Sequence, residues 1–300
     1  MKYIYIIKFI KKQQVTILTT TISNSYLTAQ IKHFGAELFS LKDNNNTEYI
    51  WEGNPVFWGK NAPILFPIVG TLKDNFYHYN GVEYHLLRHG FARDMQFERI
   101  EKYGNSVTFS LIASEETRKV YPFDFEFQII YTLDESSLNI DYKVINNSES
   151  QMPFSIGAHP AFALPGNFRN YSLEFEKEES LEYHLLEKDL ISNKTKKLAA
   201  NNKIVSLNYE LFENDALIFK SLQSNSLIIL ENFKPIVKVN FEDFPSLGIW
   251  TKNNAPFLCI EPWFGYSDTQ ESLGNIFEKE GIQILNKNET FDSKFSIEIL

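Results

Sequence analysis

Between Phe123 and Leu133 every second residue is apolar, and this alternation constrains the fold more than any other local pattern. Side chains two residues apart lie on the same face of a strand, so the segment predicts a half-buried antiparallel strand. The residues from Asp134 to Ser137 are typical of a turn, and Leu138–Ile145 predicts the strand that returns. The pattern therefore indicates a chain that folds mainly through sheets.

A second hairpin is predicted around Asn80-Gly81, because this pair is preferred in two-residue type I′ turns. The resulting register places His78 opposite Glu83 and Phe76 opposite His85. We interpret both histidines as solvated hairpin residues rather than metal ligands, because no third ligand stands at a metal-like spacing.

Short strand patterns separated by turn signals continue to the C-terminus, and helical signals are few. Ser114 is a candidate cap for a short helical turn, 272–280 predicts a brief helix, and 193–203 reads as a long polar loop. No linker rich in Gly, Ser or Pro divides the chain. The sequence predicts an all-β protein, a large antiparallel β-sandwich with few short helices.

Composition excludes several classes of partner. The chain has 300 residues and a net charge of −9, from 29 Lys and Arg against 38 Asp and Glu, without a basic block. This balance argues against nucleic acid and against an anionic membrane surface. The apolar stretch 1–10 contains two lysines and is far shorter than the roughly 20 residues of a membrane span, so we expect an extra strand or a frayed leader there, with a signal peptide as the alternative. The single cysteine allows no internal disulfide and favours a cytoplasmic location.

One histidine and one glutamate each stand directly before a proline at the end of an apolar run, in His159-Pro160 and Glu261-Pro262. A residue before proline is restricted to extended backbone, which is the kind of rigid support that a positioned acid or base needs. One imidazole and one carboxylate of this kind indicate general acid–base chemistry on a neutral substrate. The alternative interpretation is two unrelated strand ends.

The surroundings of Glu261 support the functional interpretation. Trp263 follows closely, and a carboxylate beside aromatic rings loses solvation, which raises its pKa toward the range of a general base. Cys259 shares the face of Glu261 by strand alternation, and we interpret it as a small buried hydrophobic residue because no activating neighbour is visible. Asp215 precedes the apolar run 216–219 and is a candidate acceptor for ligand hydroxyls.

The segment Arg88-His89-Gly90-Phe91-Ala92-Arg93 combines two cations, an imidazole and an aromatic ring. It predicts a pocket rim that donates hydrogen bonds to hydroxyl groups, and a basic surface loop is the alternative. The two apolar segments before it, 57–59 and 62–70, read as a buried strand with turns.

Taken together, the order and spacing of five sequence blocks resemble the aldose 1-epimerase family, the galactose mutarotases, and in particular its compact bacterial branch. The similarity extends from about residue 21 to the C-terminus, which implies a single domain at 21–300 and an N-terminal extension at 1–20. The blocks are Val56-Phe57-Trp58, Ala62-Pro63-Ile64-Leu65-Phe66-Pro67-Ile68-Val69-Gly70, Arg88-His89-Gly90-Phe91-Ala92-Arg93, Gly157-Ala158-His159-Pro160-Ala161-Phe162 and Cys259-Ile260-Glu261-Pro262-Trp263.

The resemblance implies a β-sandwich with a shallow sugar pocket on one concave sheet. It implies that Glu261 is the base that takes the proton from the C1 hydroxyl and that His159 is the acid that protonates the ring oxygen. His89 would orient the sugar, and Asp215 would hold sugar hydroxyls. The resemblance implies an aldohexose as substrate and neither a metal nor an organic cofactor. The remaining candidates for substrate binding are Arg93, Lys73, Phe91 and Trp263.

One position departs from the family pattern, because Thr71 stands where relatives usually carry a sugar-binding arginine. Lys73 could reach the same space, but lysine lacks the bidentate fork of arginine. Three alternatives therefore remain beside a mutarotase of free hexoses. They are a hexose 6-phosphate mutarotase with Arg88, Arg93 and Lys73 as phosphate ligands, a carbohydrate-binding protein without turnover, and a glycoside hydrolase using Glu261 and Asp215. The sequence leaves open whether the protein is a monomer or a homodimer.

Overall fold

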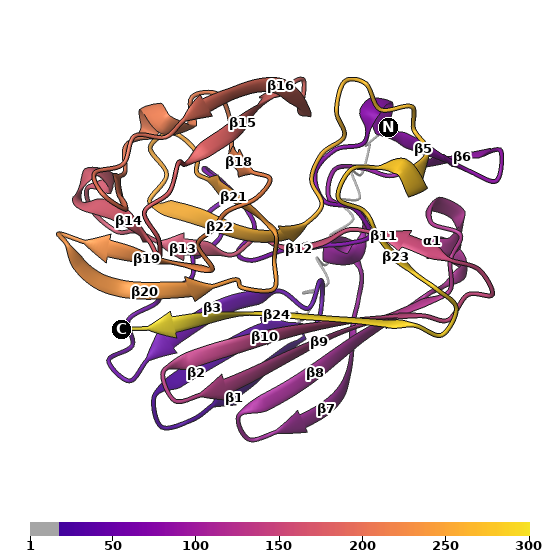
Figure 1. The fold of residues 1–300 in the computed structure, drawn as a ribbon. Coiled ribbons are helices and arrows are strands. Elements are labelled where there is room, and N and C mark those ends of the chain that lie inside the picture. Colours follow the sequence, from indigo (N-terminus) through magenta and orange to yellow (C-terminus); the bar gives the residue numbers. More distant parts are fainter. Residues whose placement is uncertain (1–17) are drawn as a thin grey trace, which may run out of the picture.

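The computed structural model describes residues 18–300, and strands form most of its regular structure (Figure 1). Among these residues α1 (Glu115–Val120) is the only α-helix, and it begins where predicted, because the Ser114 hydroxyl accepts the amide hydrogen of Thr117 at its N-terminus. No helix in this range is long and apolar enough to cross a membrane. The all-β prediction is confirmed. Residues 1–17 of the predicted extension lie outside the described part, and the first strand begins at Thr19.

Two large antiparallel sheets make up the body of the protein. The larger has nine strands, in the spatial order β17 (Ile204–Ser206), β14 (Tyr171–Phe175), β19 (Ser226–Glu231), β20 (Lys234–Asn240), β24 (Thr290–Ile299), β10 (Ser137–Asn146), β9 (Phe125–Asp134), β8 (Ser106–Ile112) and β7 (Glu98–Tyr103). The other has eight strands, namely β16 (Leu190–Lys197), β15 (Glu182–Glu187), β18 (Leu217–Phe219), β21 (Ser246–Trp250), β22 (Phe257–Phe264), β12 (Ile156–Ala158) and β4 (Ile64–Leu65) in order, with β13 (Ala161–Ala163) paired to β22.

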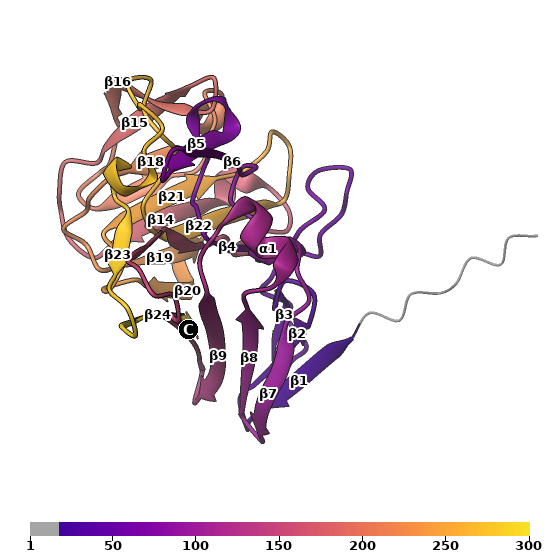
Figure 2. The same cartoon turned by 90° about the vertical axis from the view of Figure 1, so that its right-hand side faces the viewer.

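Three small sheets and five 3-10 turns complete the fold, and Figure 2 shows one small sheet, β1–β3, beside β7–β9. The strands of the small sheets are β1 (Thr19–Ser23), β2 (Leu27–Lys32) and β3 (Leu38–Asp43), β5 (Phe76–Tyr79) and β6 (Val82–His85), and β11 (Met152–Phe154) and β23 (Gln283–Leu285). The turns are η1 (Lys73–Asn75), η2 (Ala92–Asp94), η3 (Phe168–Asn170), η4 (Tyr209–Phe212) and η5 (Ile276–Glu278).

Both predicted hairpins are confirmed. Strands β9 and β10 pair over their whole length, and the alternating residues of β9 are buried. In the β5–β6 hairpin, His78 faces Glu83 and Phe76 faces His85, and both histidines are exposed.

A single large core joins the two big sheets. It contains Phe127 of β9 and Tyr142 of β10 together with Leu258 and Ile260 of β22. Since side chains alternate along a strand, the intervening residues of β22 face the other side of the eight-stranded sheet. This second face of β22 carries Glu261, so the core fixes the strand that holds the candidate base.

Three sequence predictions about elements were wrong. Segment 193–203 is not all loop, because β16 continues to Lys197, which pairs with Glu182 of β15, so opposite charges lie across the strands. Segment 272–280 holds only the three-residue turn η5. Glu261 lies inside β22 rather than at a strand end, because the strand continues through Pro262 to Phe264.

Candidate active site

Glu261 and His159 lie together on the outer face of the eight-stranded sheet. Glu261 comes from β22, where it pairs with Gly248 of β21, and His159 follows the last residue of β12. The His159 Nε2 atom lies 3.2 Å from Glu261 Oε2, and the side chains are only 10% and 2% exposed. The two residues that the sequence singled out before proline thus form one buried acid–base pair.

Burial shifts the pKa values of this pair in opposite directions. It raises the pKa of Glu261 well above its usual value, and the negative charge of Asp215 adds to this shift, whereas the positive charge of Arg88 opposes it. Burial lowers the pKa of His159 to about 3. Loss of hydration disfavours the charged form of each group, and this favours a neutral carboxyl beside a neutral imidazole.

Aromatic rings restrict the His159 imidazole. Trp58 stacks on it with 4.8 Å between ring centroids, and Trp250 meets it edge-on at 6.0 Å. No sequence pattern indicated a role for Trp250, which comes close to His159 only through the register of β21 with β22. Trp58 belongs to a segment that we interpreted as purely structural.

The acid–base pair opens into a cavity of about 380 Å³, which is within the usual range for small-molecule sites. Four further predicted residues line this cavity: His89, Asp215, Arg93 and Trp263. The lining also contains Trp58, Trp250, Arg88, Gly70, Leu186, Ala216, Ile218 and Ser267. Polar groups over an aromatic floor suit a sugar, which presents hydroxyl groups at its edge and C–H groups on its faces.

Two of the predicted binding residues do not line the cavity. The Lys73 ammonium group donates to the carbonyl oxygens of Gln270 and Ser272, at 2.7 and 3.2 Å. Phe91 packs against the core residues Phe66 and Tyr121. The sequence pattern therefore did not predict the direction of either side chain.

Trp263 occupies space that two glycines leave open. It lies across the neighbouring strands, between Gly157 of β12 and Gly248 of β21. A Cβ atom on Gly157 would lie 2.5 Å from Trp263 Cδ1, and one on Gly248 would overlap the opposite edge of the indole. Only glycine at both positions lets the indole lie flat beside Glu261.

His89 is held by a reciprocal pair of hydrogen bonds with Gly70. The Gly70 amide donates to His89 Nδ1 at 3.1 Å, and the His89 amide donates to the Gly70 carbonyl oxygen at 2.8 Å. A backbone amide can only donate, so Nδ1 carries no proton, and the neutral ring carries its proton on Nε2. Burial lowers the pKa of His89 well below its usual value, which keeps the ring neutral. The Nε2–H group is thus a fixed donor at the cavity.

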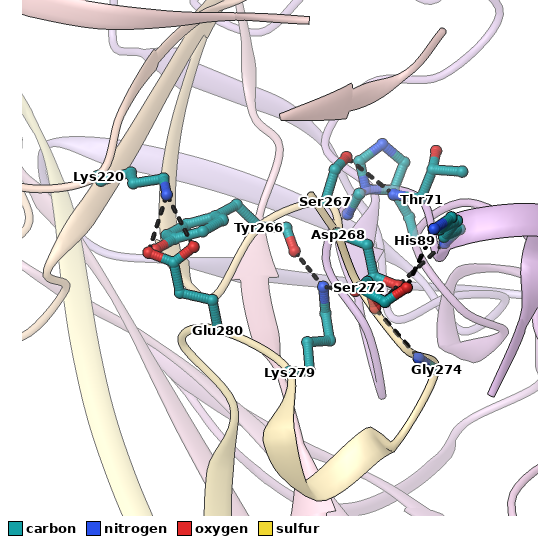
Figure 3. Close-up of polar contacts among 12 residues, drawn as sticks. Thr71, His89, Lys220, Tyr266, Ser267, Asp268, Ser272, Gly274, Lys279 and Glu280 are labelled. Atoms are coloured by element: carbon teal, nitrogen blue, oxygen red, sulfur yellow. Dashed lines mark hydrogen bonds and ion pairs between the residues drawn. The ribbon is translucent and has the colours of Figure 1, made fainter. Parts of the chain in front are cut away.

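A buried ion pair is connected to the Gly70–His89 contact through hydrogen bonds of the neighbouring residue Thr71 (Figure 3). The Thr71 amide donates to Ser267 Oγ at 2.9 Å, and the Asp268 amide donates to the Thr71 carbonyl oxygen at 2.8 Å. Lys279 Nζ then lies 2.8 Å from Asp268 Oδ1, and both side chains are almost completely buried. Thr71 itself is buried and does not line the cavity, so it does not replace the arginine of the family pattern.

Among residues 18–300, one group of side chains has the composition of a metal site: His159, Cys259 and Glu261, whose ligand atoms lie within 4.8 Å of one another. Burial and the neighbouring Glu261 charge raise the pKa of the Cys259 thiol well above its usual value. Metal coordination requires the thiolate, so this group fits a metal poorly. The buried position of Cys259 agrees with our interpretation of it as a packing residue.

Comparisons with known proteins place the chain in a family. The sequence of residues 19–298 matches the family model described as "Aldose 1-epimerase". The chain is 38% identical over 280 residues to the protein LacX (plasmid) of Lactococcus lactis subsp. lactis, which covers 87% of this chain and 92% of LacX.

Solved structures show the same fold. A galactose mutarotase related enzyme from Lactobacillus acidophilus is 35% identical, with a TM-score of 0.90 and coverage of 94% of this chain and 97% of that chain. A galactose mutarotase-like protein from Lactobacillus casei is 29% identical, with a TM-score of 0.89 and coverage of 94% and 100%. The chain therefore belongs to the aldose 1-epimerase family, a family of isomerases.

Proposed function

We propose that the protein interconverts the α and β anomers of an aldohexose, with Glu261 and His159 as the groups that transfer protons. The observation that carries the proposal is the 3.2 Å contact between a buried carboxyl and a buried imidazole on the wall of a sugar-sized cavity. Family membership supports the reaction class, and the choice of sugar is the part that we propose here.

The pair works as a unit that holds one exchangeable proton. In the active arrangement Glu261 is ionised and His159 is protonated. Glu261 accepts the proton of the C1 hydroxyl, and His159 donates its proton to the ring oxygen. The bond between C1 and the ring oxygen breaks as the C1 carbonyl forms. Rotation about C1–C2 followed by the reverse transfers closes the ring on the other face, with all protons returned.

The other cavity residues have supporting roles in this proposal. His89 donates from Nε2 toward the sugar, Asp215 accepts from sugar hydroxyls, and Trp263 provides the apolar floor. Arg93 lines the cavity, and its Nη2 group donates to the Arg88 carbonyl oxygen at 2.7 Å. Its contribution is to hold the rim in position.

The test is to follow freshly dissolved α-D-galactose, α-D-glucose and glucose 6-phosphate by NMR of the anomeric protons. We expect the wild-type protein to accelerate equilibration and Glu261→Gln to lose about 10²–10⁴-fold in kcat while still binding the sugar. Glu149→Gln is the matched control, because that carboxylate is exposed and pairs with Lys287.

The three sugars also separate the alternatives. Faster equilibration of glucose 6-phosphate alone would identify a phosphosugar mutarotase. Wild-type protein that binds the sugars without accelerating any of them would overturn the enzymatic proposal in favour of a carbohydrate-binding protein. A Glu261→Gln variant with wild-type rates would overturn the role of the pair.

A further inference from the structure

Two hydrogen-bond donors meet at the rim of the cavity without an acceptor between them. Arg88 Nε lies 3.2 Å from His89 Nε2. The Gly70 amide already occupies the lone pair on His89 Nδ1, so Nε2 carries the ring proton. Arg88 Nε also carries a hydrogen and has no lone pair to offer. A neutral imidazole accepts one hydrogen bond, and here two donors point at it.

The two contacts are not equivalent. Gly70 and His89 bind each other through backbone atoms as well, which fixes the Gly70 amide in place. The Arg88 side chain is 42% exposed, and its other partner is Asp189 at 3.3 Å, an exposed ion pair of small energy. Arg88 is therefore the less constrained of the two donors to His89.

We propose that Arg88 is a substrate-binding residue, and that it and His89 donate to the same sugar oxygen beside the acid–base pair. This proposal rests on the proposed function, since it places the ligand in that same cavity. The oxygen must offer two lone pairs, as a sugar hydroxyl does, since the ring oxygen needs a lone pair for the proton from His159. Arginine suits this role because its guanidinium is permanently charged and its N–H groups lie in one plane.

Three observations support the assignment. Arg88 and His89 both line the cavity that contains Glu261. His89 meets His159 edge-on with 5.8 Å between ring centroids, so the shared oxygen would lie close to the reacting groups. The Arg88 charge also lowers the pKa of Glu261 against the effect of burial, which favours the ionised carboxylate that the reaction needs.

The experiment compares Arg88→Gln and Arg88→Lys with wild type, using Arg169→Gln as control, because Arg169 is an exposed arginine paired with Glu210. We expect Arg88→Gln to lower kcat/KM about 10–100-fold, mainly through KM, since a charge-assisted hydrogen bond is lost. We expect its pH profile to move to higher pH, because the positive charge no longer stabilises the ionised carboxylate. Arg88→Lys should keep the pH profile and still show a raised KM.

Sugar binding measured by NMR line broadening separates this proposal from the proposed function. A wild-type protein that binds sugar without turnover, with weaker binding in Arg88→Gln, would leave the role of Arg88 standing while the mutarotase proposal fails. Active wild type with unchanged kcat/KM, pH profile and sugar binding in Arg88→Gln would overturn the role of Arg88 alone. Absence of sugar binding by wild type would overturn both.

Discussion

At the residue scale, the site depends on a carboxyl group and an imidazole that are each buried and yet touch. Burial alone would leave both groups neutral. Their contact at 3.2 Å provides a short path for one proton, and Arg88 supplies the charge that favours ionised Glu261. In the proposed mechanism the proton transfers therefore depend on three side chains from three different segments of the chain.

The pH dependence of activity follows from these shifts. Because the pKa of Glu261 is raised and that of His159 is lowered to about 3, the pair keeps one proton over a wide pH range. We expect kcat/KM to stay flat from weakly acid to neutral pH. It should fall at alkaline pH, when the pair loses its proton above the raised pKa of Glu261. Rates of anomer exchange measured across pH test this, and an activity that rises through the alkaline range would contradict it.

Local sequence pattern identified His159 and Glu261 because a following proline restricts the backbone in any fold. It could not assign Phe91 to the core or Lys73 to the 270–272 loop, since a side chain's direction there depends on 3-10 turns whose orientation is set by distant contacts. The position of Trp250 beside His159 could not be predicted either, because it depends on the register between β21 and β22.

At the element scale, the loop after β22 contributes to stability because it contains a buried ion pair. Lys279 and Asp268 are each almost fully buried. The Asp268 carboxylate also accepts hydrogen bonds from the Lys73 amide and the Ser272 hydroxyl. The sequence predicted a helix in this region. Gly274 has a positive φ of 81°, and Asn275 caps a turn of only three residues, so the backbone instead brings Lys279 to Asp268.

Breaking this ion pair should destabilise the protein. We expect Lys279→Met to lower the free energy of unfolding by about 3–5 kcal/mol, because the side chain of Asp268 would remain buried without its ion-pair partner. Urea unfolding gives the value. The double variant Asp268→Asn and Lys279→Met should recover part of the loss, since it leaves no unpaired charge. If the single variant were as stable as wild type, the pair would have no structural role.

At the scale of the whole molecule, one core spans both large sheets, so we predict that residues 18–300 unfold as one unit. The chain offers a direct check. All four tryptophans lie in or next to the cavity, whereas backbone circular dichroism reports on every sheet. The four are Trp51, Trp58, Trp250 and Trp263.

We expect tryptophan fluorescence and circular dichroism to give the same urea midpoint and slope. A fluorescence transition at clearly lower urea would mean that the cavity side unfolds on its own. That result would contradict the single domain expected from the sequence.

The contact of Trp263 with Gly157 and Gly248 has a consequence for how this site can change during evolution. A side chain at either glycine position displaces the indole, and a smaller residue in place of Trp263 leaves a void beside Glu261. Single substitutions in this trio are therefore all unfavourable, although a matched set of three could pack again. The three residues come from three different strands, yet substitution at one of them is constrained by the other two.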